Sequence, residues 1–305
     1  MKRKIIIAIA LIAVMLVPLW AQTEADFTVT LTKDGQGAVI TGYKGSVKTV
    51  RIPATIQGMP VREINRDVFA RSGINSVAIP EGVTTIVEGS FAECRQLTTI
   101  TFPKSLTSIG NRAFYGSGIT TIAIPEGLTV IGPSTFERCD KLTTVTLPST
   151  ITEIGEQAFL GCTALKTINL PEGLTTLGGA AFNGCSALAT INFPKSLTAI
   201  GNNAFGNSGL TSVVIPEGVT VISNNAFFTC EKLTSVTLPS TITTIGVSAF
   251  AYCRSLTTVT IPDTVETIRF ARDTFWGSDS VNLASQSALQ KVGYRGGFSV
   301  PDWVE

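Results

Sequence analysis

Hydrophobic and polar positions repeat along most of this chain with a period of 22 or 23 residues. The segment Phe136–Phe159 shows one unit, in which Leu142, Val145 and Leu147 are separated by threonines and followed at once by a proline. Such alternation is typical of a short strand with one buried face, and proline ends a strand because it has no N–H to continue a ladder. The pattern therefore predicts one short strand per unit.

A second apolar group follows the proline of the same unit, at Ile151, Ile154, Ala158 and Phe159, with Gly155 at the turn between them. A unit of this size cannot bury both groups alone, so successive units must stack and share a core. The sequence therefore predicts a repeat solenoid, a right-handed coil in which parallel strands of successive units lie ~4.8 Å apart.

Proline and phenylalanine mark the phase of the repeat. Phenylalanine follows proline by eleven residues in each of the eight units that begin at Pro80 and end with the unit of Pro239. The link from phenylalanine to the next proline is one residue shorter where it reads F-x-x-S-G instead of F-x-x-C-x-x-L. We expect that glycine to adopt a positive φ, which would let the shorter turn close.

A longer period shows that a block of four units was duplicated. Phe102–Ser105 recurs as Phe193–Ser196, and Leu147–Thr150 recurs as Leu238–Thr241, both with a displacement of 91 residues. The same displacement relates the cysteines in pairs: Cys94 to Cys185, Cys139 to Cys230, and Cys162 to Cys253.

The N-terminal residues 1–22 are predicted to be a signal peptide, because a basic start precedes the apolar stretch from Ile5 to Leu19. That stretch is shorter than the ~20 residues that a membrane-spanning helix needs. Cleavage at Ala21, Gln22 or Ala25 fits equally well, and a buried N-terminal helix is the alternative. We expect no membrane span in the mature chain and, without a cysteine near the cleavage point, no lipid anchor motif.

The two ends of the repeat are predicted to be capped. Residues 23–51 read as an N-terminal β cap, a hairpin with strands near 27–31 and 38–41. The solenoid is expected to occupy residues 52–276, with a surface loop at Gln57–Pro60. Residues 277–305 read as a C-terminal cap and tail, with a short helix from an N-cap at Ser285 to Val292.

The repeated motif L-x-x-[IV]-x-[ILF]-P, followed after two residues by [LVI]-T-x-[IL]-G-x-x-A-F-x-x-C, resembles the BspA-like leucine-rich repeats of bacterial surface proteins. The resemblance implies a leucine-rich-repeat solenoid that binds proteins. It further implies an adhesin of a host-associated bacterium, with a host matrix or cell-surface protein as partner. The units depart from the motif at Val87, Ser223 and Arg269.

Charge and composition exclude several functions. Without the three basic residues of the predicted signal peptide, the chain of 23 basic and 22 acidic residues keeps 20 basic ones and has no basic run, so nothing predicts nucleic-acid binding. It contains no histidine, which removes Ser-His-Asp and Cys-His catalysis and every histidine-containing zinc site. We therefore predict that the protein is not an enzyme and needs no cofactor and no metal.

The six cysteines are interpreted as small buried residues, because each lies three residues after the phenylalanine of its unit and no C-x-x-C occurs. Disulfides are a less favoured alternative. Adjacent coils lie within disulfide reach but coils two apart do not, so at least two thiols are expected to be free.

The outward position of the strands is the candidate binding surface. Two residues before successive prolines, the side chains are mostly small and uncharged: Thr101, Ala123, Thr146, Asn169, Asn192, Val214, Thr237 and Thr260. These residues form the strand strip. Threonine also simply suits an exposed strand, so a structural role is an equal alternative. Binding residues could equally lie among variable charged pairs such as Glu137-Arg138, Asp140-Lys141 and Glu231-Lys232.

From these features we predict an exported, non-enzymatic scaffold that binds a protein through its repeats. Its expected location is the cell surface or the secreted fraction, with the periplasm possible. The alternative is a structural or envelope-assembly component of the periplasm without a host ligand. A glycan-binding or glycan-active protein is the weakest of the three hypotheses.

Overall fold

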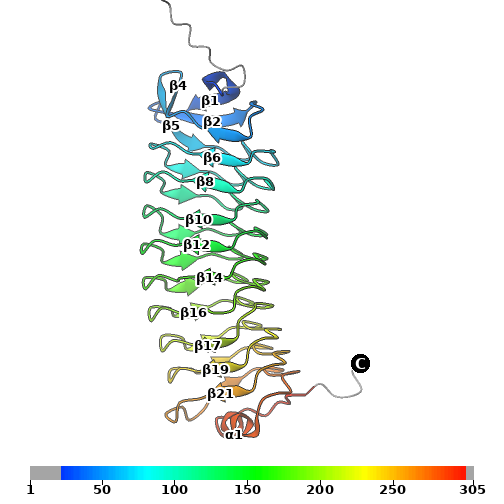
Figure 1. The fold of residues 1–305 in the computed structure, drawn as a ribbon. Helices are drawn as coiled ribbons and strands as arrows, with labels where there is room; N and C mark the ends of the chain where they lie inside the picture. The colour runs from blue at the N-terminus through cyan, green and yellow to red at the C-terminus, as the bar shows by residue number, and fades with distance from the viewer. Residues whose placement is uncertain (1–21, 300–305) are drawn as a thin grey trace, which may run out of the picture.

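The computed structural model describes residues 22–299, so the predicted signal peptide (residues 1–22) falls almost entirely outside the described part. The chain forms an elongated stack of coils, with β1 and β2 at one end and α1 at the other (Figure 1). The repeat solenoid predicted from the sequence is confirmed.

The strands that precede the prolines run parallel along one wall, as predicted. They form three separate ladders: β3 (Thr49–Arg51), β6 (Ser76–Ala78) and β8 (Thr99–Thr101); β10 (Thr121–Ala123), β12 (Thr144–Thr146) and β14 (Thr167–Ile168); and β17 (Ser212–Val214), β19 (Ser235–Thr237) and β21 (Thr258–Thr260). Val145 is buried between two exposed threonines because side chains alternate along a strand. This wall positions the strand strip.

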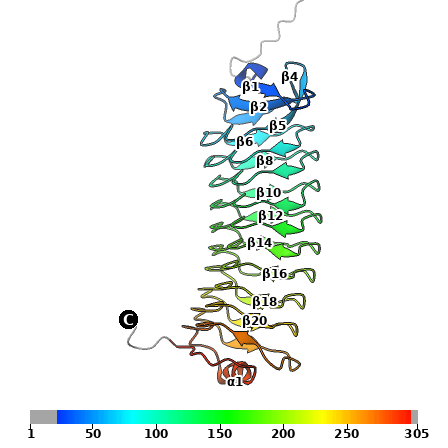
Figure 2. The same ribbon diagram turned by 180° about the vertical axis from the view of Figure 1, so that it is seen from behind.

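The prediction of one strand per unit is incomplete, because a second ladder runs along another wall of the coil (Figure 2). Its strands are almost all two residues long: β5 (Met59–Ile64), β7 (Thr85–Ile86), β9 (Ser108–Ile109), β11 (Val130–Ile131), β13 (Glu153–Ile154), β15 (Thr176–Leu177), β16 (Ala199–Ile200), β18 (Val221–Ile222), β20 (Thr244–Ile245) and β22 (Arg269–Phe270). Strands this short show no alternation that a sequence pattern could reveal.

A third wall carries the phenylalanines on a chain of turns. The residues two before and two after each phenylalanine have positive φ, as Gln157 and Gly161 do around Phe159. The turns aim the Phe159 amide at the next coil, where it donates to the Ala181 carbonyl oxygen at 2.9 Å. Backbone hydrogen bonds therefore join the coils along this wall as well.

The phenylalanines form one continuous buried column, as the stacking argument requires. Phe114, Phe136, Phe159 and Phe182 are fully buried, and successive ring centroids lie 5.3–5.5 Å apart with nearly parallel planes. The same stacking continues from Phe69 to Phe275 in every coil: Phe69, Phe91, Phe114, Phe136, Phe159, Phe182, Phe205, Phe227, Phe250 and Phe275.

The predicted N-terminal hairpin is present as β1 (Phe27–Leu31) and antiparallel β2 (Ala38–Tyr43), after a short 3-10 helix, η1 (Glu24–Asp26). β2 then pairs with β5 and so closes the second ladder. The surface loop expected at 57–60 is instead a tight hairpin between β4 (Thr55–Ile56) and β5. Gln57 and Gly58 have positive φ, which permits a two-residue turn.

The C-terminal helix is also present, but it begins earlier than predicted. α1 spans Leu283–Lys291, and its N-cap is Asn282, whose side-chain oxygen accepts a hydrogen bond from the Ser285 amide at 2.9 Å. Ser285 was misassigned because asparagine and serine cap equally well and the sequence offers both. The segment after α1 places Tyr294 edge-on against Phe275 and so covers the end of the phenylalanine column.

Candidate functional site

The strand strip is exposed as predicted, but it is not continuous. Only Thr237 is half-buried, whereas Val214 is 65% exposed. Thr146 and Thr237 lie within ladders, while Asn192 belongs to no strand. The ladder breaks between β8 and β10 and again before β17, where the coils carry the shorter Ser-Gly links.

Threonines beside the strip also have a structural role. The Thr143 hydroxyl donates to the Thr120 carbonyl oxygen at 2.9 Å, and the Thr234 hydroxyl donates to the Thr211 carbonyl oxygen at 2.9 Å. The same bond recurs beside the second ladder, where the Thr243 hydroxyl donates to the Thr220 carbonyl oxygen at 3.0 Å. Each such hydroxyl satisfies a backbone oxygen of the preceding coil, so threonine content by itself does not indicate a binding face.

The acidic residues that follow the prolines also stabilise the stack. The Glu217 carboxylate accepts hydrogen bonds from the Ser240 amide at 3.0 Å and the Ser240 hydroxyl at 2.6 Å, and these bonds lower the pKa of Glu217. Glu81 likewise accepts from the Lys104 amide at 3.0 Å. Each contact joins one coil to the next, so these carboxylates do not form an acid–base pair.

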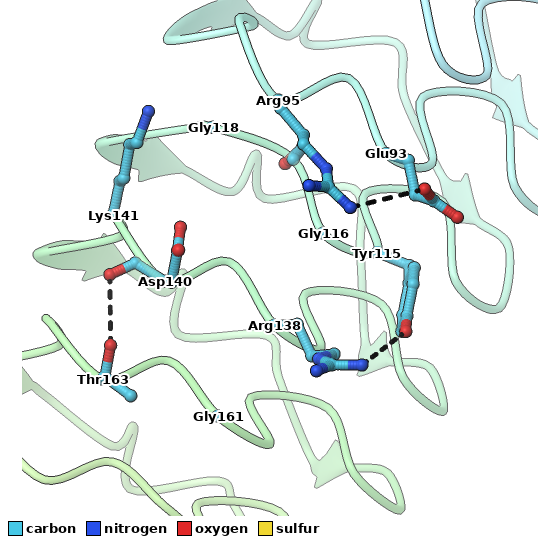
Figure 3. Close-up of a pocket in the computed structure, with 11 residues that line it drawn as sticks. Glu93, Arg95, Tyr115, Gly116, Gly118, Arg138, Asp140, Lys141, Gly161 and Thr163 are labelled. Atoms are coloured by element: carbon cyan, nitrogen blue, oxygen red, sulfur yellow. Dashed lines mark hydrogen bonds and ion pairs between the residues drawn. The ribbon is translucent and has the colours of Figure 1, made fainter.

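A hollow on the described surface is lined by four successive coils beside a Ser-Gly link. It has a volume of about 790 Å³, and we call it the notch (Figure 3). The notch is lined by Glu93, Arg95, Tyr115, Gly116, Ser117, Gly118, Arg138, Asp140, Lys141, Gly161 and Thr163. Its lining residues lie on the turns that lead into β8, β10, β12 and β14, whose coils carry Thr101, Ala123, Thr146 and Asn169 of the strand strip.

The short link at Gly118 creates the notch, but not in the way that the sequence predicted. Gly118 does not have positive φ. A Cβ at this position would lie only 2.2 Å from the Arg95 carbonyl oxygen, so the turn packs directly against the preceding coil. The middle turn is therefore set back, while Arg95 and Asp140 project from the longer turns on either side.

Charged groups converge at the notch in an ordered arrangement. Arg71 and Arg95 share the Glu93 carboxylate at 3.5 and 3.8 Å. Arg138 donates to the Tyr115 hydroxyl oxygen at 3.3 Å, and this bond raises the pKa of the Arg138 guanidinium further. Arg138, Asp140 and Lys141 belong to the variable charged pairs that the sequence analysis named as possible binding residues. Arg95 and Tyr115 were missed because they occupy positions of the unit where the repeat has no characteristic residue type.

A family model described as "BspA type Leucine rich repeat region (6 copies)" matches residues 62–189 and 154–282. The two overlapping matches together cover well over half of the chain. The chain belongs to the BspA-type leucine-rich repeat family.

Several solved structures are similar to this chain. A leucine-rich repeat protein from Bacteroides ovatus is 26% identical, with a TM-score of 0.63 over 84% of this chain and 80% of that chain. The pneumococcal vaccine antigen PcpA is 19% identical, with a TM-score of 0.56 over 84% and 78% of the two chains. A leucine rich cell surface protein from Faecalibacterium prausnitzii is 26% identical, with a TM-score of 0.45 over 79% and 94%.

A comparison with curated protein sequences finds no significant match. The BspA-type family and the solenoid fold support a repeat scaffold for protein interaction, and such scaffolds are typically non-enzymatic. No group of three or more His, Cys, Asp or Glu residues within residues 22–299 could hold a metal ion. In the same residues, no helix is long and apolar enough to cross a membrane.

The cysteines of the BspA-type units are free and buried, as predicted. Each thiol donates to the backbone oxygen of a phenylalanine one coil earlier, for example Cys162 to Phe136 at 3.1 Å. Where the link reads Ser-Gly, Ser117 occupies the same place and lies 3.4 Å from the Cys139 sulfur. The cysteines are therefore structural hydrogen-bond donors and not reactive groups.

We expect the native protein to resist thiol reagents. Burial raises the pKa of Cys139 and of Cys185 from 9.0 to about 12, so these thiols stay neutral and sequestered well above pH 8. Labelling with iodoacetamide, read by intact mass, should modify none of the six cysteines in the folded protein and all six in urea. Rapid labelling of the native protein would contradict this account.

The raised pKa of these buried thiols also determines how the stability of the fold changes with pH. Above pH 9 the unfolded chain releases thiol protons that the folded chain retains, so rising pH favours the unfolded state. We expect the melting temperature to fall between pH 9 and pH 11, and a variant with Cys139→Ser and Cys185→Ser should lose part of that decline. Serine is a suitable control because Ser117 already occupies this position in another coil.

Proposed function

We propose that this chain is an exported, non-enzymatic scaffold that acts in adhesion at the cell surface and binds a host protein through the outward face of its repeats. The observation that carries the proposal is a rigid stack that holds the exposed strand strip beside the charged notch. The notch residues lie on the turns that lead directly into the strands of the strip, so one macromolecular partner could contact both.

Export is supported by the sequence of the N-terminal segment and by membership of the BspA-type family. The strand strip supports protein contact, because its side chains Thr101, Thr146 and Val214 are exposed and uncharged. An extended array of this kind is the surface that solenoid repeats commonly offer to partners.

Two measurements on the producing cells and the mature protein test this proposal. External protease should cleave the protein on intact cells, and the purified mature protein should capture defined host matrix proteins such as fibronectin, laminin or fibrinogen. Complete protection from external protease, together with capture of envelope components only, would instead establish the periplasmic structural role.

A further inference from the structure

We propose that the notch binds a carboxylate side chain of an acidic, extended segment in the protein partner. The inference rests on the proposed function, because it assigns a specific contact to that protein-binding face. The notch holds basic and aromatic side chains in a rigid hollow beside the strand strip.

Donors for a carboxylate are available at the notch. The only hydrogen bond of the Arg138 side chain among the described residues is the one to the Tyr115 hydroxyl. Neither Arg138 nor Lys141 has a carboxylate within ion-pair distance in that part of the chain. A guanidinium offers a planar pair of N–H donors that matches the two oxygens of a carboxylate.

The donors are held in place before any partner arrives. The Arg112 guanidinium lies 4.6 Å from the centre of the Tyr115 ring, and Arg138 bonds the hydroxyl of the same residue. Tyr115 is thus fixed between two arginines, as Figure 3 shows for Arg138. Tyrosine and arginine are enriched among residues that dominate binding energy, and pre-ordering them reduces the entropy lost on binding.

The solenoid itself does not need these side chains. In the second copy of the duplicated block, 91 residues later, Arg95, Tyr115 and Arg138 are replaced by Ser186, Gly206 and Thr229. The coils there stack with the same geometry, since Phe205 and Phe227 lie 5.5 Å apart like Phe114 and Phe136. The charged set in the first copy is therefore surplus to folding and points to a contact.

The mixed charge of the notch favours a peptide over a polyanionic glycan. Glu93 and Asp140 lie among the basic residues and would repel a chain that carries a sulfate on every sugar. An acidic side chain flanked by neutral or basic residues avoids this repulsion, and its neighbours can pair with Asp140. The volume of about 790 Å³ lies within the range of ~300–1,000 Å³ that is typical of ligand pockets, which is ample for one acidic side chain.

The test uses the mature protein and a phage library of random 12-residue peptides. Selection on the wild type should enrich peptides that contain Asp or Glu, and synthetic copies are then measured by calorimetry. The variant Arg95→Ser, Tyr115→Gly, Arg138→Thr installs the residues of the second copy and should weaken binding at least tenfold. The control Lys195→Ser, Arg254→Thr removes the same number of charges with residues that Ser149 and Thr163 already provide, and should change affinity less than twofold.

Three results would overturn the inference: enriched peptides without acidic residues, equal affinity of the triple variant and the wild type, or competition by heparin oligosaccharides but not by acidic peptides. The triple variant also separates the two proposals. If it still captures the host proteins that the wild type captures, the notch assignment fails and the proposed function stands. If the wild type captures none of them, the proposed function fails.

Discussion

Replacing Phe159 with alanine is expected to lower the free energy of unfolding by about 3–5 kcal/mol, the range found for large aromatic truncations in cores. Phe159 is fully buried, with its ring centroid 5.4 Å from Phe136 and 5.3 Å from Phe182. The cavity would therefore interrupt the phenylalanine column between two coils. In a solenoid each coil is stabilised only by its neighbours, so the damage should spread to both sides.

The measurement is urea unfolding followed by circular dichroism, together with amide hydrogen exchange resolved along the chain. Exchange should accelerate most in the coils that contain Phe136 and Phe182 and least in the two caps. Phe228→Ala is the matched control, because Phe228 is only half-buried and contacts Tyr252 outside the column. A loss of about 1 kcal/mol is expected there, and equal losses in the two variants would refute the column as the main source of stability.

The phenylalanine column and the first strand ladder could be predicted because their signals repeat in phase. Each proline fixes where a strand ends, and each phenylalanine follows at a constant distance. Ten copies of a weak signal make a strong one, and the buried position of Cys162 was predicted in the same way, from its fixed place three residues after a phenylalanine. Stacking converts periodicity in sequence into columns in space.

Other features could not be predicted because the sequence pattern was too short or allowed two interpretations. The second ladder uses two-residue strands such as Glu153–Ile154, whose hydrogen bonds depend on the neighbouring coil and leave no local pattern. At the C-terminal cap, Asn282 and Ser285 are both good N-caps, and only packing against the last coil selects between them. Local propensity cannot decide such cases.

The notch shows most clearly why the site was only partly predictable. The sequence marked the Ser-Gly link and the variable pair Asp140-Lys141, but it did not show that residues of four coils would meet in one hollow around a shorter turn. Arg95 and Arg138 lie 43 residues apart and meet across the coil that contains Tyr115. Convergence of this kind depends on how far each turn projects, which composition does not encode.

Gly118→Ala is expected to destabilise the protein by about 1–3 kcal/mol through overpacking and to deform the notch. The new Cβ would lie 2.2 Å from the Arg95 carbonyl oxygen and 2.9 Å from its carbon. Both atoms are backbone, so no side-chain rotation can relieve the clash and the turn must move outward. Thermal unfolding measures the loss, and affinity for an acidic peptide selected on the wild type reports the change in the notch.

Gly73→Ala is the matched control, because Gly73 belongs to the same Ser-Gly motif but has different neighbours. Its Cβ would meet only the Lys48 amine at 3.0 Å and the Gln96 side-chain oxygen at 3.7 Å, both at the ends of flexible side chains. The control should therefore change stability by less than about 0.5 kcal/mol, as surface substitutions usually do. If Gly118→Ala had an equally small effect on stability, the close approach of the backbone could not be what sets the middle turn back. The origin assigned to the notch would then be wrong.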